Sequence, residues 1–324
     1  MRPKSTDSWH TPTKRAKRPG KAAPDTRQSL QEGLVVASFG ARLEVEDAAG
    51  GRLQCNAVRG GEPVVCGDRV RFALLRSGAG KRVGAVRELL PRRSLLCRPS
   101  PDGALRPMAA NLDRMLIVLA PAPALYEGII DRYLIAAEHF GIPPVLVVNK
   151  VDLLAAEQHR ALRERLAPYA ALGYDLVWAS AKREDGLDAL RATLRGHTSV
   201  FVGQSGVGKS SLVGQLLPET DVRVGAISEA TGQGRHTTTT ARLYHLPEGG
   251  DVIDSPGVRE FSLWNIAPRE AAQGFIEFRP YLAQCRFNDC THTHEPGCGV
   301  IAAAERGEIT PRRLASYRQI IEQP

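Results

Sequence analysis

The chain has 324 residues, 43% of them hydrophobic, and a formal net charge of +8, so it is long enough for two or three globular domains. No stretch approaches the roughly 18 consecutive apolar residues of a membrane span, and the first residues lack the apolar core of a secretory signal. We therefore expect a cytoplasmic protein with no membrane partner.

The excess of positive charge is concentrated in residues 1–29. Up to residue 28 this segment holds eight Lys or Arg residues against two acidic residues, Asp7 and Asp25. It has almost no large apolar side chains, so burial cannot offset the entropy that would be lost on folding. We expect a basic disordered tail, which either stays solvated or serves as an arm that contacts phosphate groups.

Residues 30–98 have the pattern of a small all-β domain. Short stretches of partial apolar–polar alternation follow one another, and Gly, Asp or Pro interrupts them. A segment of this length fits an OB-fold, a five-stranded barrel that often binds oligonucleotides. Basic residues favour contact with nucleic acid over a role as a spacer. They include Arg42, Arg52, Arg59, Arg69, Arg71, Lys81 and Arg82.

Residues 107–276 alternate between apolar runs and amphipathic stretches, which is typical of a parallel sheet covered by helices. Gly141 is placed to end one of these helices. The expected strands cover 114–120, 145–148, 175–179 and 199–202, and the expected helices cover 129–141 and 187–194, with a further helix through Leu162 and Leu166. We therefore expect an α/β domain.

The stretch "GQSGVGKS" at 203–210 matches the phosphate-binding P-loop in full, between an expected strand and an amphipathic helix. Its glycines let backbone N–H groups close around phosphate oxygens, and the helix N-terminus adds positive potential. Lys209 should reach the β- and γ-phosphates as a catalytic group, and Ser210 should ligate Mg²⁺. The expected nucleotide contacts are Gly203, Gln204, Ser205, Gly206, Val207, Gly208, Lys209, Ser210 and Ser211.

Two short motifs at strand ends predict that the base is guanine. In "NKVD" (149–152), the Asp152 carboxylate can accept hydrogen bonds from the ring N1–H and the exocyclic amine of guanine, a donor pair that adenine lacks. Asn149 would brace the pocket, and the Lys150 stem would lie over the base. The second motif is "SAK", formed by Ser180, Ala181 and Lys182, and the backbone N–H of Ala181 can meet the guanine O6.

"DSPG" at 254–257 fits the third nucleotide motif of GTPases. Asp254 would hold Mg²⁺ through its water shell, and the Gly257 N–H would meet the γ-phosphate. Val258 stands where Ras-like proteins have a water-orienting Gln, which predicts slow intrinsic hydrolysis or a substitute group. His236 is the candidate substitute for a catalytic role, and the alternative is an ordinary loop histidine.

A segment rich in Gly and Thr, "GQGRHTTTT" at 232–240, is typical of a switch loop. One threonine hydroxyl should coordinate Mg²⁺ in the GTP-bound state. Thr238 and Thr239 are the candidates, and four consecutive threonines leave the choice between them open.

The motifs occur in an unusual order. The two base motifs come first, then the P-loop, the switch loop and the magnesium motif, whereas an ordinary GTPase begins with the P-loop. This order predicts a circularly permuted GTPase, which a sheet tolerates when the natural termini lie close together. The switch region then runs directly into the C-terminal segment, so hydrolysis could move that segment.

The C-terminal segment, 277–324, predicts a small zinc-binding domain with a helix. Cys285, Cys290, His292 and Cys298 have the spacing C-x4-C-x-H-x5-C, and three thiolates with one imidazole suit one tetrahedral, structural Zn²⁺. His294 is a rival for the histidine ligand. A helix is expected at 310–323 after the N-cap Thr310, with its arginines, Arg312, Arg313 and Arg318, available to solvent or phosphate.

Together these residues resemble the RsgA or YjeQ family of small-ribosomal-subunit GTPases over about residues 30–320. The resemblance rests on the permuted order, "GQSGVGKSSL", "GRHTTT", "DSPGVREF", the Cys/His spacing and "IDRYLIAAE" (130–138). It implies late maturation of the 30S subunit, contacts with its 16S rRNA, cycling between GTP and GDP, and hydrolysis stimulated by the subunit. It also implies that His236 is the catalytic histidine. We expect a monomer.

Two other functions are compatible with the same residues. The first is an RNA-binding module in which the nucleotide only stabilises the fold, although intact Lys209, Ser210 and Asp254 argue against a degenerate pocket. The second is a permuted GTPase that acts on the 50S subunit. Measuring GTP hydrolysis with and without 30S subunits distinguishes a stimulated GTPase from an RNA-binding module with a structural nucleotide. Cosedimentation with separated subunits distinguishes a protein that acts on the 30S subunit from one that acts on the 50S subunit.

Overall fold

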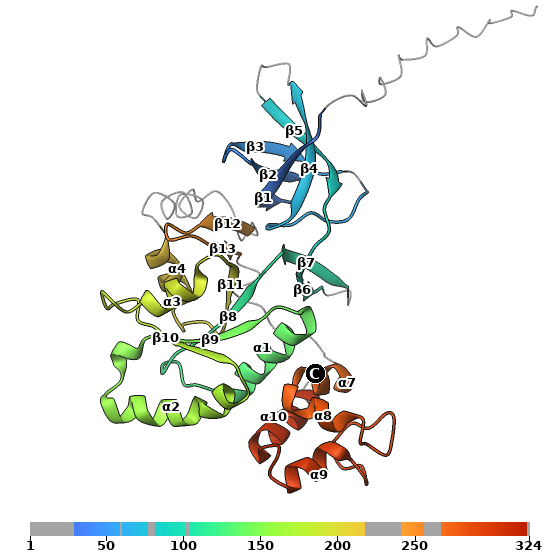
Figure 1. Ribbon diagram of the computed structural model, residues 1–324, viewed down its shortest axis with the longest axis vertical. Coiled ribbons are helices and arrows are strands. Elements are labelled where there is room, and N and C mark those ends of the chain that lie inside the picture. Colours follow the sequence, from blue (N-terminus) through green and yellow to red (C-terminus); the bar gives the residue numbers. More distant parts are fainter. Residues whose placement is uncertain are drawn as a thin grey trace, which may run out of the picture.

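The structure is a computed structural model, and it describes residues 29–58, 60–76, 82–100, 104–217, 241–255 and 267–322. Within these ranges the chain forms a β-barrel, a short hairpin, an α/β unit and a C-terminal group of helices (Figure 1). Among the described residues, none of the helices combines the length and the apolar character needed to cross a membrane.

The barrel has the five strands that the sequence predicts. They are β1 (Gln31–Phe39), β2 (Arg42–Asp47), β3 (Arg52–Asn56), β4 (Arg69–Arg76) and β5 (Arg82–Leu89), in the order β1-β2-β3-β5-β4. β1 also pairs with β4, so the sheet closes on itself. Val35, Leu43 and Phe72 fill the interior. A Cβ at Gly33 would lie 2.5 Å from Val45 Cγ1 and 2.9 Å from the Glu46 carbonyl oxygen, so the close approach of β2 leaves room only for glycine there.

An antiparallel hairpin follows the barrel, and the sequence patterns did not predict it. β6 (Leu95–Pro99) pairs with β7 (Leu105–Ala110) between the barrel and the α/β unit (Figure 1). The Asn111 side-chain amide donates to the Gly67 carbonyl oxygen at 2.9 Å and so ties the end of the hairpin back to the barrel.

The α/β unit confirms the expected alternation of strands and helices. Its strands are β8 (Arg114–Leu119), β9 (Pro144–Val148), β10 (Asp175–Trp178), β11 (Thr198–Val202), β12 (Ala241–His245) and β13 (Asp251–Asp254), in the order β10-β9-β8-β11-β13-β12. Five of them are parallel, and β12 runs antiparallel to β13. The sequence patterns predicted a parallel sheet and did not predict β12.

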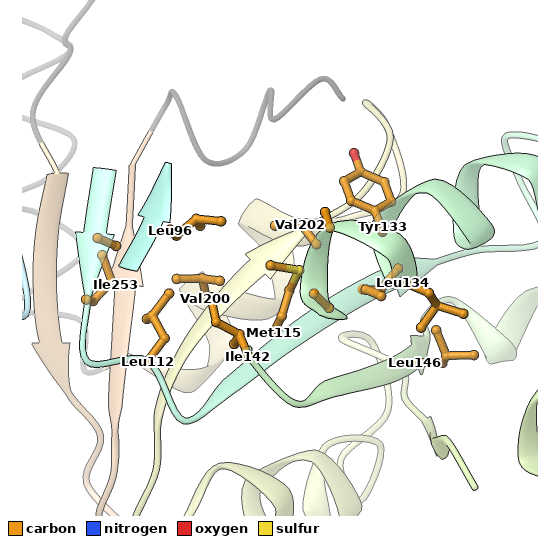
Figure 2. Close-up of a cluster of buried hydrophobic side chains, with 14 of the residues drawn as sticks. Leu96, Leu112, Met115, Tyr133, Leu134, Ile142, Leu146, Val200, Val202 and Ile253 are labelled. Atoms are coloured by element: carbon orange, nitrogen blue, oxygen red, sulfur yellow. The ribbon is translucent and has the colours of Figure 1, made fainter. Parts of the chain in front are cut away.

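Helices cover both faces of this sheet. They are α1 (Glu127–Phe140), α2 (Ala156–Ala171), α3 (Asp188–Leu194) and α4 (Lys209–Leu216). Because side chains alternate along a strand, Met115 and Ile117 face one core with α1 and α2, whereas Leu116 and Val118 face a second core with α3 and α4. Figure 2 shows the first core, to which Met115 from β8 and Leu134 from α1 both belong.

The barrel and the α/β unit share one continuous sheet. β12 pairs antiparallel with β1, with Ala37 opposite Arg242 and Ser38 opposite Ala241. His245 bridges the same junction, since its Nε2 lies 2.8 Å from Glu46 Oε1 on β2. The barrel is therefore joined to the edge of the α/β sheet farthest from β10.

The C-terminal group consists of short helices around an aromatic core. It comprises α7 (Pro268–Gly274), the 3₁₀ turn Ile276–Phe278, α8 (Arg279–Leu282), α9 (Gly299–Glu305) and α10 (Pro311–Glu322). Phe275, Phe278 and Tyr317 pack together in its core. Thr310 Oγ1 accepts a hydrogen bond from the Arg313 N–H at 3.4 Å, which agrees with its predicted role as N-cap.

One expectation about α10 is wrong. Arg313 was expected to be available to solvent or phosphate, but its side chain is 2% exposed and forms ion pairs with Asp131 and Glu277. The guanidinium also lies over the Phe275 ring, 4.3 Å from its centroid. The helical periodicity placed Arg313 among polar positions, and the acidic partners lie far away in the chain and were not visible from spacing alone.

Candidate nucleotide and metal sites

The P-loop joins β11 to α4 and follows Val202 at the carboxyl end of a buried strand. All three of its glycines have backbone conformations that only glycine adopts easily: φ is +140° at Gly203, +81° at Gly206 and +95° at Gly208. A Cβ would lie 2.4 Å from the Val118 carbonyl oxygen at Gly203, and 2.4 Å from Asn149 Nδ2 at Gly208. The glycines therefore let the loop approach the neighbouring strands closely.

Lys209 begins α4 and is 8% exposed. Its ammonium donates hydrogen bonds to the carbonyl oxygens of Gly203 at 2.6 Å and Gln204 at 2.7 Å. The cation is thus held over the loop that would surround the phosphates. Ser210 and Ser211 follow it in the first turn of α4 and are exposed.

The guanine motif lies beside the P-loop and is bonded to it. Asn149 is 1% exposed, and its Nδ2 donates to the Val207 carbonyl oxygen at 2.9 Å. Lys150 donates from Nζ to the carbonyl oxygens of Gly206 at 2.6 Å and Ala122 at 2.9 Å. In the described part of the chain, Asn149 Oδ1 is buried without a donor. A ligand can supply that missing hydrogen bond.

Asp152 lies in the 3₁₀ turn Val151–Leu153, which follows β9. Its Oδ1 accepts a hydrogen bond from Ser180 Oγ at 2.5 Å, and Ser180 Oγ also accepts one from the Lys182 backbone N–H at 3.2 Å. Ser180 is fully buried, so it fixes the carboxylate of the first guanine motif against the backbone of the second.

A cavity of about 590 Å³ lies between these motifs. Asn149, Lys150, Asp152, Ala181, Lys182, Gly208 and Ser211 line it, together with Leu153, Gly214 and Gln215. The last three belong to no motif, and the sequence analysis missed them. The helical repeat of α4 was the available signal, since Ser211, Gly214 and Gln215 share one face at three- and four-residue spacing.

Asp254 ends β13 and is half-buried. Val200 on β11 lies opposite Ile253 on β13 in the parallel register, so Asp254 and Gly203 reach the same edge of the sheet. Acidic side chains at this edge suit a magnesium ion that bridges phosphates. His236, Thr238, Thr239 and Gly257 lie outside the described residues.

The C-terminal cysteines and a histidine form one compact cluster. The ligand atoms of Cys285, Cys290, His292 and Cys298 all lie within 4.8 Å of one another. His292 Nδ1 lies 3.5 Å from Cys285 Sγ and 3.4 Å from Cys298 Sγ, and these two sulfurs are 3.9 Å apart. Tetrahedral coordination with Zn–S bonds of ~2.3 Å places two sulfurs roughly 3.8 Å apart. The cluster therefore has the dimensions of a metal site.

The histidine in this cluster is His292. His294 is exposed, and its Nδ1 lies 2.8 Å from Thr293 Oγ1. Burial raises the pKa of the Cys290 thiol to about 12, so thiolates form here readily only in the presence of a cation. The cluster can hold a metal ion.

The chain is similar to several known proteins. The family model described as RsgA GTPase matches residues 89–264. A protein of Azotobacter vinelandii named small ribosomal subunit biogenesis GTPase RsgA is 52% identical over 295 residues, covering 90% of this chain and 85% of that protein. A protein of the same name from Pseudomonas aeruginosa is 51% identical over 291 residues, covering 90% of this chain and 85% of that protein.

Two solved structures share the fold. YjeQ from Thermotoga maritima is 32% identical with a TM-score of 0.72, and the match covers 91% of this chain and 98% of that one. YloQ, described as a circularly permuted GTPase, is 25% identical with a TM-score of 0.71, covering 93% of this chain and 97% of that one. The chain belongs to the RsgA GTPase family.

Proposed function

We propose that this protein hydrolyses GTP to GDP and phosphate in the late maturation of the 30S ribosomal subunit, and that the subunit stimulates hydrolysis. The proposal rests on one observation: the guanine motifs and the P-loop surround a single cavity. Asn149 and Lys150 are hydrogen-bonded to the P-loop, and Asp152 is hydrogen-bonded to Ser180. The names of the curated relatives supply the ribosomal context.

The chain's own residues account for guanine binding. The Asp152 carboxylate, fixed by Ser180, accepts hydrogen bonds from the ring N1–H and exocyclic amine of guanine. Ala181 lines the same cavity, where its N–H can meet the guanine O6. Adenine presents no such donor pair, so the site selects guanine by leaving the half-buried Asp152 carboxylate unpaired with the wrong base.

The P-loop side of the site binds the phosphates and stabilises their negative charge. The P-loop N–H groups surround the phosphate oxygens, and Lys209 exchanges its carbonyl partners for the β- and γ-phosphates. We assign magnesium binding to Ser210, Asp254 and one of Thr238 and Thr239. A magnesium ion bound there would neutralise the negative charge that develops on the phosphates. We assign orientation of the attacking water to His236, because Val258 carries no group that can do so.

Each domain of the chain has a distinct role in the proposed function. We propose that residues 107–276 form the permuted GTPase domain, that the OB-fold at 30–98 and the basic tail at 1–29 contact 16S rRNA, and that 277–324 form a zinc domain. The protein would act in the cytoplasm as a monomer. The basic residues of the barrel and the tail support contact with a polyanion.

Hydrolysis measured with each ribosomal subunit tests the proposal. We expect purified 30S subunits to raise kcat by about tenfold or more, because an essential group is completed only on the partner. Purified 50S subunits should have no such effect, and both should be compared with the protein alone. Stimulation by 50S subunits only would favour the alternative target, and GTP binding without any turnover would favour a structural nucleotide.

Zinc binding gives a separate prediction with a matched pair of variants. We expect His292→Ala to reduce bound zinc well below one ion per chain and to lower the thermal stability, because three thiolates alone leave the site incomplete. His294→Ala should retain one zinc ion, since its imidazole lies outside the cluster. Metal analysis of the two purified variants checks this, and equal zinc content would contradict the assignment.

A further inference from the structure

The loop that carries His292 has an unusual backbone conformation. At His292 φ is +58°, in the left-handed region that residues other than glycine seldom adopt. In this conformation His292 Nδ1 lies 3.5 Å from Cys285 Sγ and 3.4 Å from Cys298 Sγ. Because the position of the imidazole depends on a disfavoured conformation, the contacts that maintain the loop also maintain the metal site.

The half-buried Glu295 carboxylate binds the backbone on both sides of His292. Its Oε1 accepts a hydrogen bond from the Thr291 N–H at 2.7 Å and another from the Thr291 hydroxyl. Its Oε2 accepts from the N–H groups of Thr293 at 2.9 Å and His294 at 3.1 Å. Backbone N–H groups that converge on one anion form strong, charge-assisted bonds. Glu295 thus fixes the peptide units that precede Thr291, Thr293 and His294.

Helix α10 holds the one remaining peptide unit beside His292. The Tyr317 hydroxyl donates a hydrogen bond to the Thr291 carbonyl oxygen at 2.8 Å. That carbonyl and the His292 N–H belong to the same peptide unit, so the bond sets the direction in which the chain enters His292. Tyr317 is fully buried and packs edge-on against Phe275 and Phe278, so its hydroxyl moves only if α10 moves.

The same helix is fixed to the α/β unit, since α10 packs against α1 (Figure 1). Arg313 lies one turn before Tyr317, on the same face of α10. Its buried guanidinium donates to Asp131 Oδ1 on α1, and its Nη2 donates to Glu277 Oε2 at 3.0 Å. Asp131 is fully buried and also accepts from the Tyr169 hydroxyl of α2 at 2.6 Å. A guanidinium held by two carboxylates allows α10 little movement relative to α1.

We propose that α10 couples the metal site to the α/β unit, with Glu295 and Tyr317 as positioning residues for the His292 ligand. The contact of Arg313 with α1 fixes α10, and α10 fixes Tyr317 against the ligand loop. Separation of α10 from α1 would weaken metal binding, and loss of the metal would weaken the contact with α1, because coupling between two sites is reciprocal. The inference rests on the zinc site of the proposed function and does not depend on GTP hydrolysis.

The first test changes the carboxylate beside the ligand loop. Zinc affinity of the full chain is measured by competition with a chromophoric chelator. Glu295→Gln should weaken zinc affinity by about 10- to 100-fold, because an amide N–H₂ would face the backbone donors and the ligand would lose its orientation. Glu305→Gln is the matched control, since Glu305 is exposed at the end of α9 and should bind zinc like the unmodified chain.

The second test removes the hydroxyl that α10 contributes. Tyr317→Phe loses the donor to Thr291, together with a longer contact of the same hydroxyl, 3.3 Å from the Pro268 carbonyl oxygen. We expect zinc affinity to fall by about tenfold. Tyr174→Phe is the control, because it removes a similarly buried hydroxyl that has no hydrogen-bond partner in the described part of the chain.

The third test acts from the α/β unit. Asp131→Asn keeps the shape of the side chain and removes the charge that pairs with Arg313, so zinc affinity should fall by about fivefold. In the Tyr317→Phe background the same change should have no further effect, because the contact between α10 and the ligand loop is already missing. If Asp131→Asn fails to fold, Tyr126→Phe replaces it in the cycle, since the Tyr126 hydroxyl donates to Gln319 Oε1 of α10 at 2.7 Å.

A general loss of stability needs its own control. Leu190 lies in the second core, on the opposite face of the sheet from α1. Leu190→Ala should therefore lower the melting temperature and leave zinc affinity unchanged. GDP binding by each variant confirms that the α/β unit is folded.

The outcomes separate this inference from the proposed function. Weaker zinc binding in Glu295→Gln, Tyr317→Phe and Asp131→Asn, with a non-additive cycle, supports the coupling. Unchanged zinc affinity in Tyr317→Phe or in Asp131→Asn, or additive effects in the cycle, would overturn it. An unmodified chain that takes up no zinc would overturn both the metal assignment and the coupling, whereas absence of GTP hydrolysis in the zinc-loaded chain would overturn only the proposed enzyme.

Discussion

Lys209→Ala is expected to reduce kcat for GTP hydrolysis by about 100- to 1000-fold, the range measured when a preorganised donor to developing charge is removed. The Lys209 ammonium lies against two P-loop carbonyl oxygens, 2.6 Å from that of Gly203 and 2.7 Å from that of Gln204. Because α4 is anchored by Leu212 and Leu216 in the core, loss of the ammonium should leave the fold intact.

The control for this variant removes a positive charge elsewhere in the same domain. Arg195 is 63% exposed and pairs with Glu248 at 3.1 Å on the surface, so Arg195→Ala should hydrolyse GTP at the unmodified rate. Single-turnover hydrolysis with 30S subunits, together with a melting curve for each variant, measures both effects. A Lys209→Ala protein that is folded and fully active would show that GTP hydrolysis does not depend on the P-loop lysine.

Asp152→Asn should weaken GTP binding by about 100- to 1000-fold, because two hydrogen bonds to a charged acceptor are lost and an amide N–H faces the donors of the base. The same change should allow a xanthine nucleotide to bind, since xanthine carries a carbonyl oxygen where guanine carries the exocyclic amine. Ser180 Oγ still has an oxygen at residue 152 as its acceptor, so the local structure is retained.

Competition between GTP and xanthosine triphosphate measures this exchange of specificity. Asp185→Asn is the matched control, since Asp185 follows the second guanine motif and its side chain is 75% exposed. The control should keep the preference for GTP. If Asp152→Asn bound GTP as tightly as the unmodified protein, Asp152 would have no contact with the base.

The parts of the fold predicted from sequence are those with strong local signals. The parallel strands at the centre of the sheet are short apolar runs buried on both faces, and their predicted limits lie within one or two residues of β8, β9, β10 and β11. The Cys285 to Cys298 cluster spans fourteen residues, so its spacing already indicated that the ligands would meet.

The missed features depend on contacts between distant segments. β12 is five residues long, and it pairs on one side with β13 and on the other with β1, where Arg242 lies opposite Ala37. Arg313 and Asp131 are separated by 182 positions, so no local pattern connects them. Burial of a charged side chain is decided by whichever partners the tertiary structure supplies, which helical periodicity cannot reveal.

The central claim is that the permuted chain assembles one guanine-selective, magnesium-dependent pocket. Calorimetric titration of the protein with GDP and with ADP, each with and without Mg²⁺, tests it most directly. The account predicts one site per chain for GDP that is tighter with Mg²⁺, and no detectable binding of ADP at the same concentrations. ADP bound as tightly as GDP would contradict the account.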